Sequence, residues 1–297
     1  MVKVFEFLYE VVSMTNLPRI TWYDYHGKIT PYQMFMEAIE KMGEGVKGIF
    51  TTWLAKQTTC EYMLWNYIAD FYETGEVVQE DTEFSAKGNE IHNLLAFGTT
   101  ESLMEKYRDG KSYLQWRNLD ELHKYQQQRL SSIYKGKITE YALVGEISGL
   151  KVRGTFDALE LDSGTLIEIK TRARPTLPYV HERKNKMQLL TYYFLAKNYN
   201  KDLNDPGFPV GKLSEYAKIQ YFHQADQRLL GEIVIHVPYE AERYLKAIDY
   251  SKEFWMGTRR PTFSLKYCIY CRFTNSCYYH KKFYRQPPRR HDAPGSN

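Results

Sequence analysis

The stretch Arg153-Gly154-Thr155-Phe156-Asp157, followed after a short turn by Ile167-Glu168-Ile169-Lys170, decides the fold of this 297-residue chain. Apolar and β-branched residues dominate 152–161 and 165–171 on either side of the turn-forming Asp162-Ser163-Gly164. We therefore predict a β-hairpin in this part of the chain.

The hairpin brings two carboxylates and an amine together. Side chains alternate between the faces of a strand, so Glu168 and Lys170 share a face in any register. A two-residue turn at Asp162-Ser163 or Ser163-Gly164 places Asp157 opposite Glu168 or Lys170. Both registers put the three charged groups on one face.

These residue types suit metal chemistry. Neighbouring carboxylates repel each other unless a divalent cation or a lysine relieves the repulsion, and hard oxygen ligands favour Mg²⁺ or Mn²⁺. Such an ion polarises a phosphodiester, while a lysine positions water or stabilises negative charge. The pattern indicates a metal-dependent nuclease. The alternative is a solvated hairpin with ordinary charges, because short motifs match by chance.

Two helical segments flank the hairpin in sequence. Gln188 and Tyr192, four residues apart, project from one face of a helix predicted over 179–199. Upstream, Gly88 lies one helical turn before His92, where a missing side chain lets backbone or ligand approach. The packing face of the 179–199 helix is expected to comprise Leu189, Tyr193 and Ala196.

The ordered set Gly88-x-x-x-His92, Gly154-x-x-Asp157, Glu168-x-Lys170 and Gln188-x-x-x-Tyr192 resembles the RecB-like branch of the PD-(D/E)xK nuclease superfamily. This chain has Phe156 in place of the proline of the superfamily's name, but RecB-like members commonly show this Gly-x-x-Asp form. The resemblance implies a restriction-endonuclease-like α/β fold, with a mixed central sheet flanked by helices. It also implies the site roles: His92, Asp157 and Glu168 bind the metal, Lys170 assists catalysis, and Gln188 and Tyr192 contact nucleic acid or support the site.

A further acidic residue precedes the hairpin. A strand is predicted over 138–147, and it contains Glu140 and Glu146. In the resembled family an acidic residue near this strand often assists the site, and Glu140 is the better match. The alternative is an exposed strand charge.

Three of the four cysteines crowd the C-terminal region as Cys268-x-x-Cys271-x5-Cys277, and Cys60 lies far upstream. Under reducing conditions this spacing favours metal binding over disulfides. Zinc sites usually form from two close pairs, so an iron-sulfur cluster fits at least as well. The alternative for Cys60 is a small buried apolar residue.

The cysteine arrangement resembles that of iron-sulfur RecB-like nucleases, which include CRISPR-associated adaptation nucleases and exonuclease V proteins. The resemblance implies a [4Fe-4S] cluster in a C-terminal cap, with Cys60, Cys268, Cys271 and Cys277 as ligands. We expect an N-terminal extension over 1–50, a nuclease domain over 51–284 with a helical N-terminal region, and a disordered basic tail over 285–297.

The net charge of +4 is too small to indicate nucleic-acid binding alone, but basic residues gather near the C-terminus and would neutralise phosphates. Among 26 tyrosines, Tyr179, Tyr192 and Tyr270 are candidates to stack on single-stranded bases, although most rings will be core. The basic residues are Arg259, Arg260, Lys266, Arg272, Lys281, Lys282, Arg285, Arg289 and Arg290.

The sequence thus predicts a Mg²⁺- or Mn²⁺-dependent DNA exonuclease for single strands or duplex ends. The resemblance favours 5′-to-3′ polarity and a partner system in DNA repair or CRISPR adaptation. The alternatives are a non-cutting nucleic-acid-binding scaffold and a zinc-stabilised structural protein.

No apolar run approaches the roughly 20 residues of a membrane span, and we expect a cytoplasmic, or in eukaryotes nuclear or organellar, protein. The oligomeric state is not readable from the sequence.

Overall fold

The computed structural model describes residues 27–76, 88, 90–92, 94–95, 116–177, 183–199, 213–264, 268, 271, 273 and 277. In chain order, the elements with both ends described are α2 (Pro31–Lys41), β1 (Ile49–Phe50), α3 (Thr51–Lys56), α4 (Glu61–Thr74), α7 (Leu119–Ser131), β2 (Lys137–Ile147), β3 (Leu150–Glu160), β4 (Leu166–Arg172), α8 (Arg183–Lys197), β5 (Tyr216–His223), β6 (Leu229–His236) and α9 (Val237–Trp255).

The central strand of the mixed sheet is β3. On one side it pairs antiparallel with β2 along nearly its whole length. On the other side it pairs parallel with β1 near its start and antiparallel with β4 near its end. The sheet then continues through β5, which is parallel to β4, to β6, which is antiparallel to β5. The predicted mixed sheet flanked by helices is confirmed.

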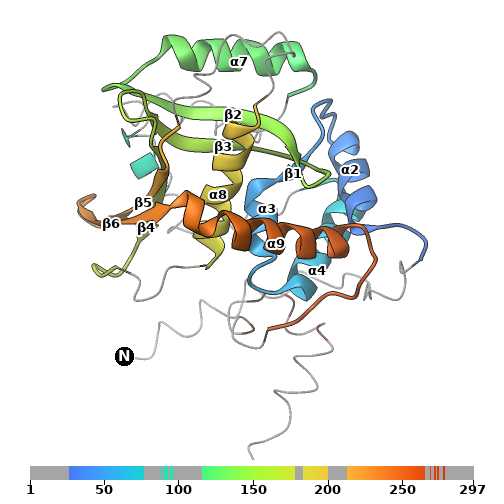
Figure 1. Cartoon of the computed structure of the whole chain (residues 1–297). Helices are drawn as coiled ribbons and strands as arrows, with labels where there is room; N and C mark the ends of the chain where they lie inside the picture. The colour runs from blue at the N-terminus through green and yellow to red at the C-terminus, as the bar shows by residue number, and fades with distance from the viewer. Residues whose placement is uncertain are drawn as a thin grey trace, which may run out of the picture.

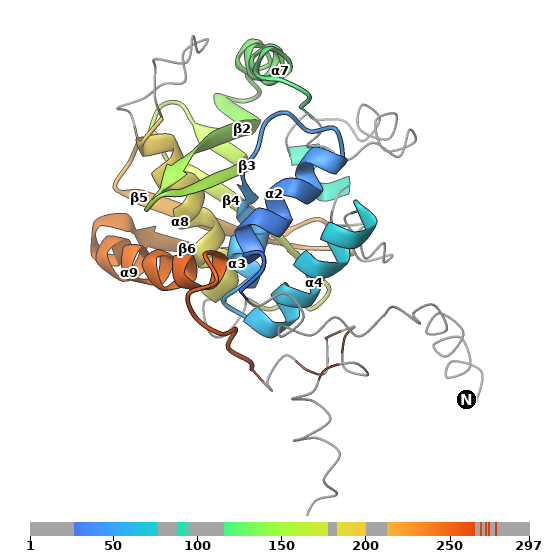
Figure 2. The same cartoon turned by 90° about the vertical axis from the view of Figure 1, so that its right-hand side faces the viewer.

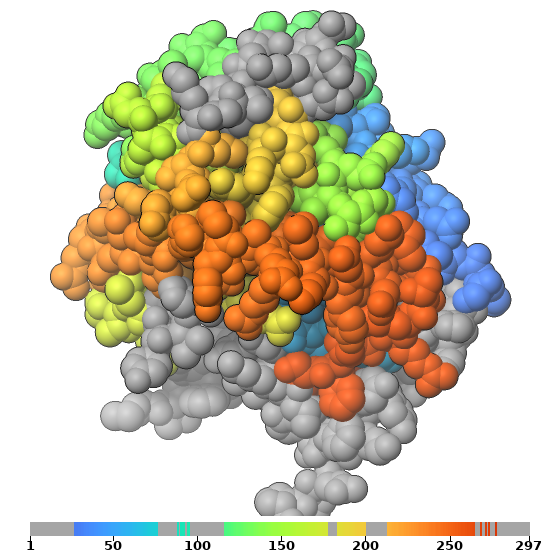
Figure 3. All heavy atoms as spheres, viewed as in Figure 1, coloured from blue at the N-terminus to red at the C-terminus, as the bar shows by residue number. Residues whose placement is uncertain are grey.

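Helices cover both faces of this sheet (Figure 1). On one face α8 packs against the sheet from β2 to β5, with α3 and α9 beside it. The outer surface of α9 forms a broad band in the space-filling view (Figure 3). On the opposite face α7 packs against β2, and the side view shows it apart from the group formed by α2, α3 and α4 (Figure 2).

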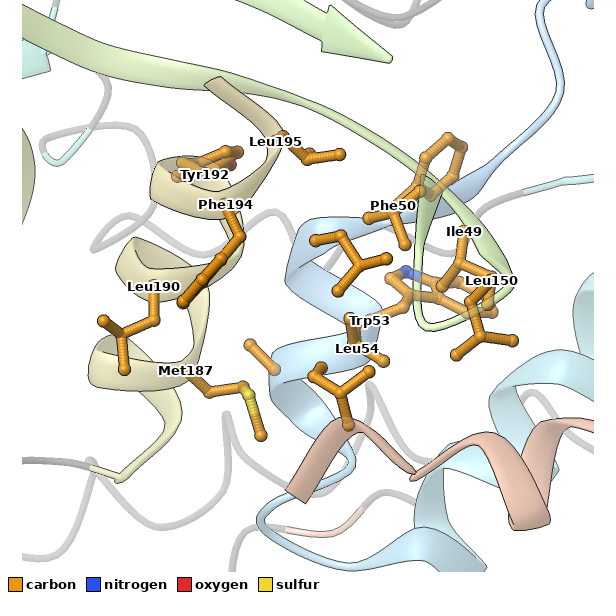
Figure 4. Close-up of a cluster of buried hydrophobic side chains, with 14 of the residues drawn as sticks. Ile49, Phe50, Trp53, Leu54, Leu150, Met187, Leu190, Tyr192, Phe194 and Leu195 are labelled. Atoms are coloured by element: carbon orange, nitrogen blue, oxygen red, sulfur yellow. The ribbon is translucent and has the colours of Figure 1, made fainter. Parts of the chain in front are cut away.

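The main core surrounds α3, with Met187 and Leu190 of α8 on one side of this helix and Trp53 beside Ile49 and Leu150 on the other (Figure 4). The predicted packing face of α8 is confirmed, since its three residues are all buried. The prediction was too narrow, however, because every residue from 187 to 196 is buried. A helix enclosed between a sheet and other helices needs apolar residues on all sides, which erases one-sided periodicity.

The N-terminal part of the described chain belongs to the same core. Thr30 caps α2 through a hydrogen bond from the Gln33 N–H, and Pro31 occupies the first turn, where its missing N–H costs nothing. Met34 and Ile49 of α2 and β1 are fully buried in the main cluster. The functional division at residue 50 stays a prediction. The predicted tail over 285–297 lies outside the described residues.

Candidate active site

The strands β3 and β4 meet in one of the two predicted registers. Ala158 pairs with Ile167 and Leu159 with Leu166, which makes Asp157 and Glu168 opposite neighbours. The predicted two-residue turn was wrong, because the Glu160 N–H donates to the Thr165 carbonyl at 3.0 Å and leaves 161–164 as the loop. Gly164, with a φ of 67°, provides the left-handed conformation that closes this wider loop.

The two strands separate just beyond these pairs. In place of a backbone pair, Oδ2 of Asp157 accepts a hydrogen bond from the Ile169 N–H at 2.5 Å. The carboxylate therefore fills the gap that opens between β3 and β4. A side chain held by a strand backbone has little rotational freedom, so Asp157 is fixed before any ligand arrives.

Opposite Asp157 on the other neighbouring strand lies Glu140, flanked by the pairs Thr139–Ala158 and Tyr141–Phe156. Glu140 has a φ of 50°, an uncommon and strained conformation for a non-glycine residue. The hydroxyl of Tyr125 donates to the Glu140 carbonyl at 2.6 Å and supports it.

The strain at Glu140 coincides with a change in side-chain alternation. Ile138 and Tyr141, three residues apart instead of two, both pack in the main core, as do Phe156 and Leu159 on β3. The alternation of inward and outward side chains is therefore shifted by one residue once in β2 and once in β3. These two shifts lie opposite each other in the paired strands. The result places Glu140 and Asp157 together where the sheet is irregular, a typical position for functional groups.

His92 reaches Asp157 from the face of the sheet opposite to the one that α8 covers. Residues 88, 90–92 and 94–95 are helical, and Ile91 packs against Ile167 and Ile169. A side chain at Gly88 would lie 3.0 Å from the Thr171 hydroxyl, so the glycine permits this close packing. Nδ1 of His92 lies 3.5 Å from Oδ1 of Asp157.

Together His92, Glu140 and Asp157 offer three ligand atoms that all lie within 4.8 Å of one another. One imidazole nitrogen and carboxylate oxygens can bind Mn²⁺ or Mg²⁺. This group is the candidate metal centre of the described residues.

Charges around this centre are unbalanced. Burial, followed by the nearby Asp157 carboxylate, raises the pKa of Glu140 to about 8. The same two causes raise the pKa of Glu168 to about 7 against the opposing effect of Lys170. Burial would also raise the pKa of Asp157, but His92 and Lys170 outweigh it and lower that pKa. The nearby cations thus do not offset the burial of Glu140 and Glu168, and a divalent cation would relieve the repulsion among the three carboxylates.

Lys170 connects the carboxylates to α8. Its Nζ donates to Oε1 of Glu168 and lies 3.4 Å from Oε1 of Gln188. The amide of Gln188 then donates to the Tyr192 hydroxyl at 3.2 Å, which also accepts from Thr51 at 2.7 Å. This chain of hydrogen bonds fixes the position of the lysine.

One atom of this network has no partner. Oε2 of Glu168 is buried and makes no hydrogen bond, although Oε1 is held by Lys170. An unsatisfied buried carboxylate oxygen is costly, about 1–3 kcal/mol or more. Such an atom is suited to accept a metal ion or a metal-bound water.

Close packing around Gly154 explains why the first position of the Gly-x-x-Asp pattern is a glycine. A Cβ on Gly154 would lie 2.4 Å from Oγ1 of Thr51 and 2.9 Å from the ring of Tyr192. The glycine therefore lets α3 and α8 approach β3 closely enough for the Thr51–Tyr192 hydrogen bond to form.

The structure brings the predicted catalytic and metal-binding residues together, with two differences in detail. The predicted metal ligands were His92, Asp157 and Glu168, whereas the group with ligand spacing contains Glu140 in place of Glu168. Glu168 is instead paired with Lys170. Tyr192 is 2 % exposed, so the prediction that its ring could stack on a base was wrong. The other two stacking candidates, Tyr179 and Tyr270, lie outside the described residues.

A signal in the sequence could have raised the importance of Glu140. Ser148 and Gly149 both have positive φ angles, 51° and 78°, and form the tight turn between β2 and β3. Applying hairpin pairing to this turn, with Ile147 opposite Leu150, places Glu140 opposite Asp157. Serine followed by glycine is a recognisable turn pair.

The four predicted cluster ligands influence one another. Burial raises the pKa of the Cys60 thiol, and Cys277 adds to the shift. Burial also raises the pKa of Cys271 to about 11, with further contributions from Cys60, Cys277 and Cys268. Because the pKa values of Cys60 and Cys271 are raised, a cationic metal centre would help to stabilise their thiolates.

A buried ion pair connects Cys60 to the C-terminal region. Cys60 precedes α4, and the next residue, Glu61, is 3 % exposed and pairs with Arg259. Glu61 also accepts hydrogen bonds from the backbone and hydroxyl of Thr262, both at 2.8 Å. Arg259 was predicted to neutralise phosphates, but this pairing gives it a structural role, so that prediction was wrong for Arg259.

The fold agrees with a match to a known protein family. The chain belongs to the PD-(D/E)XK nuclease superfamily, whose family model matches residues 64–278. Among solved structures it is similar to the protein SSO0001, at 19% identity and a TM-score of 0.45 over 82% of this chain and 94% of that one. It is also similar to a Eubacterium rectale protein named "Putative exonuclease", at 11% identity and a TM-score of 0.48 over 85% and 92%. No curated protein sequence matches significantly.

Membership of this superfamily makes nuclease activity and a nucleic-acid substrate the expected chemistry of the site. In the part of the chain that the structure describes, no helix is both long and apolar enough to cross a membrane.

Proposed function

We propose that this protein is a Mg²⁺- or Mn²⁺-dependent DNA exonuclease that acts on single strands or on duplex ends. We favour 5′-to-3′ degradation in DNA repair or CRISPR adaptation, on the resemblance to RecB-like iron-sulfur nucleases. The observation that carries the proposal is the meeting of His92, Glu140 and Asp157 within 4.8 Å, next to the Lys170–Glu168 pair.

The residues present fit a divalent cation. The three grouped ligands, the Glu168 Oε2 without a hydrogen bond among the described residues, and the raised pKa values of Glu140 and Glu168 all favour a bound hard ion. A metal ion held there would polarise the scissile phosphodiester and lower the pKa of the attacking water.

Other side chains near the proposed ion have separate roles in catalysis and positioning. Lys170, held between Glu168 and Gln188, is placed to orient the water and to stabilise negative charge on the phosphate oxygens. Gln188 and Tyr192 position the lysine, and the burial of Tyr192 supports this role over base contact. The expected products carry a 5′-phosphate and a 3′-hydroxyl.

We also propose that Cys60, Cys268, Cys271 and Cys277 bind a [4Fe-4S] cluster with a structural role. Support comes from the mutual influence of the thiols and from the Glu61–Arg259 pair beside them. Anaerobically purified protein should be brown and contain iron and sulfide. Stoichiometric zinc without iron would refute the cluster.

The activity is tested with Asp157→Ala and Lys170→Ala on 5′-labelled and 3′-labelled single strands, duplexes and circular single strands with Mn²⁺. We expect each variant to lose at least about 100-fold in rate, because each removes an electrostatic contribution to the transition state. The wild type should release short products from 5′ ends and leave circles intact.

Matched controls are Asp249→Ala on α9 and Lys124→Ala on α7, which remove the same charges from exposed positions. Both should cut at the wild-type rate. Full cleavage by both site variants would overturn the enzyme assignment, and binding without cleavage by the wild type would favour a scaffold. Cutting of circles would replace exonuclease by endonuclease action.

A further inference from the structure

The last residue of β4, Arg172, lies on the candidate active-site face. It follows Glu168 and Lys170 at intervals of two, and side chains at such intervals share one face of a strand. The parallel pairing of β4 with β5 continues without a shift to Arg172 opposite His223, so the alternation holds to this residue. Lys170 and Arg172 are therefore consecutive cations on that face, with Cα atoms about 7 Å apart.

The guanidinium of Arg172 has open hydrogen-bond donors. Its Nη1 is buried without a hydrogen-bond partner, and the side chain forms no ion pair within the described residues. Other partly or fully buried arginines are engaged: Arg153 with Glu44, Arg129 with Thr139, and Arg259 with Glu61. An enclosed donor without a partner costs about 1–3 kcal/mol, and more when it is charged.

Among the described residues, no carboxylate forms an ion pair with Arg172. Lys170 holds Glu168. On the neighbouring strand His223 binds Asp226 at 2.8 Å, and Asp226 also pairs with Arg228 at 3.1 Å. Within the part of the chain that the structure describes, the Arg172 guanidinium is therefore available to bind an added anion.

The backbone of Arg172 is fixed. Its carbonyl accepts a hydrogen bond from the Gln224 N–H at 2.9 Å, and the adjacent Thr171 hydroxyl accepts one from the Gln224 amide at 3.1 Å. Arg172 therefore presents its planar donors from a rigid strand end. That geometry matches the paired oxygens of a phosphate, which a guanidinium binds through two hydrogen bonds.

We propose that Arg172 binds the backbone phosphate next to the one that is cleaved, and so sets the position of the DNA strand. The proposal rests on the proposed nuclease function, because the strand must pass Lys170 to reach Arg172. Arg172 acts in binding: it holds the strand in register, and cleavage is left to the residues around the metal centre.

The test compares Arg172→Ala, Arg172→Gln and Arg172→Lys with Arg228→Ala, an exposed arginine on the turn between β5 and β6. Loss of a charged hydrogen-bonding pair corresponds to roughly a 10- to 100-fold weaker Kd and higher KM for single-stranded DNA. We expect kcat at saturating DNA to change less than about 3-fold, because no transition-state group is removed.

Salt dependence separates a phosphate contact from a merely structural role. The slope of log Kd against log salt should fall by about 0.7 in Arg172→Ala and Arg172→Gln, the value for one phosphate on a single strand. Arg172→Lys should keep the slope and recover only part of the affinity, because lysine lacks the paired donors. Arg228→Ala should leave Kd, KM and slope unchanged.

The phosphate itself is located by replacing single linkages with uncharged methylphosphonates along the strand. At the linkage next to the scissile one, the substitution should weaken binding to the wild type but not to Arg172→Ala. Wild-type affinity and slope in folded Arg172→Gln would overturn the proposal while leaving the nuclease assignment intact. A wild-type protein that neither binds nor cuts DNA would instead refute the proposed function.

Discussion

The Asp157 site and the cysteine site are built in opposite ways. The carboxylates of the first face cations of the protein itself, His92 and Lys170. In the second, burial and neighbouring thiols raise the pKa values of Cys60, Cys268 and Cys271, and backbone hydrogen bonds oppose that shift for Cys60 and Cys271. The fold can therefore maintain the acidic site without its metal, whereas the thiols need a metal centre to become thiolates. We expect metal loss to stop activity at the first site and to reduce stability at the second.

The largest effect is expected from neutralising the acidic site. Glu168→Gln keeps the side-chain shape but removes the charge beside the proposed ion, so kcat should fall by about 100- to 1,000-fold. The melting temperature should fall as well, because the neutral amide leaves the partly buried Lys170 without its ion-pair partner. Nuclease assays with Mn²⁺ and thermal unfolding measure both quantities.

The companion variant Glu140→Gln tests which residues bind the metal. The sequence predicted His92, Asp157 and Glu168, whereas the group with ligand spacing in the structure is His92, Glu140 and Asp157. If Glu140 binds the metal as its position beside His92 and Asp157 indicates, the variant should require more Mn²⁺ for half-maximal activity. A normal Mn²⁺ requirement together with an inactive Glu168→Gln would restore the ligand set predicted from the sequence. Iron content should stay at the wild-type level in both variants, and its loss would contradict the independence of the two sites.

The next effect concerns the cysteine site. Cys271→Ala should lose most of its iron and lower the melting temperature by roughly 5–10 °C, because a structural metal centre contributes directly to folding free energy. Asp157→Ala should keep the wild-type iron content, because Asp157 lies in the other site. A Cys271→Ala protein with full iron and an unchanged melting temperature would remove Cys271 from the ligand set.

A smaller loss of stability is expected from breaking the ion pair that connects the Cys60 region to the C-terminal region. Glu61→Gln breaks the buried pair with Arg259 beside Cys60 and should cost about 2–3 kcal/mol, as for hydrogen bonds to charged groups. The control Glu242→Gln breaks the exposed pair with Lys246 on α9 and should change the melting temperature by no more than about 1 °C. Iron should dissociate faster from Glu61→Gln alone. Equal unfolding curves for the two variants would contradict the connecting role of Glu61.

Local rules were sufficient to predict much of this arrangement. Turn residues and strand alternation predicted the β3–β4 hairpin and the shared face of Glu168 and Lys170, because both depend on neighbours in sequence. Four-residue spacing likewise predicted that Gln188 and Tyr192 would share a helix face, and they are hydrogen-bonded.

Long-range contacts account for what the sequence did not reveal. The phase change at Glu140 depends on a strained backbone that Tyr125 supports from another element, and no propensity predicts a φ of 50° at a glutamate. The burial of Tyr192 depends on α3, and the pairing of Arg259 depends on α4. From the sequence alone, Tyr192 and Arg259 were expected to contact nucleic acid, because the sequence does not show which distant residues pack against them.

The smallest effect should come from Gly154→Ala, which changes only the packing around the acidic site. Gly154 does not need a left-handed conformation, so the added methyl acts through contact with Thr51 and Tyr192 alone. Overpacking of this kind costs about 1–3 kcal/mol, and displacement of Tyr192 should also lower kcat through Gln188 and Lys170.

A second substitution tests that steric explanation. Thr51→Ala removes both the Oγ1 and Cγ2 atoms that the new methyl would meet, at the expense of the hydrogen bond to Tyr192. Because the two changes share one contact, the double variant should be destabilised by less than the sum of the single variants. Strict additivity in thermal unfolding would mean that Gly154 acts on the backbone. Since neither change reaches the thiols, iron content should be constant across the cycle, which separates packing of the acidic site from stability conferred by the cluster.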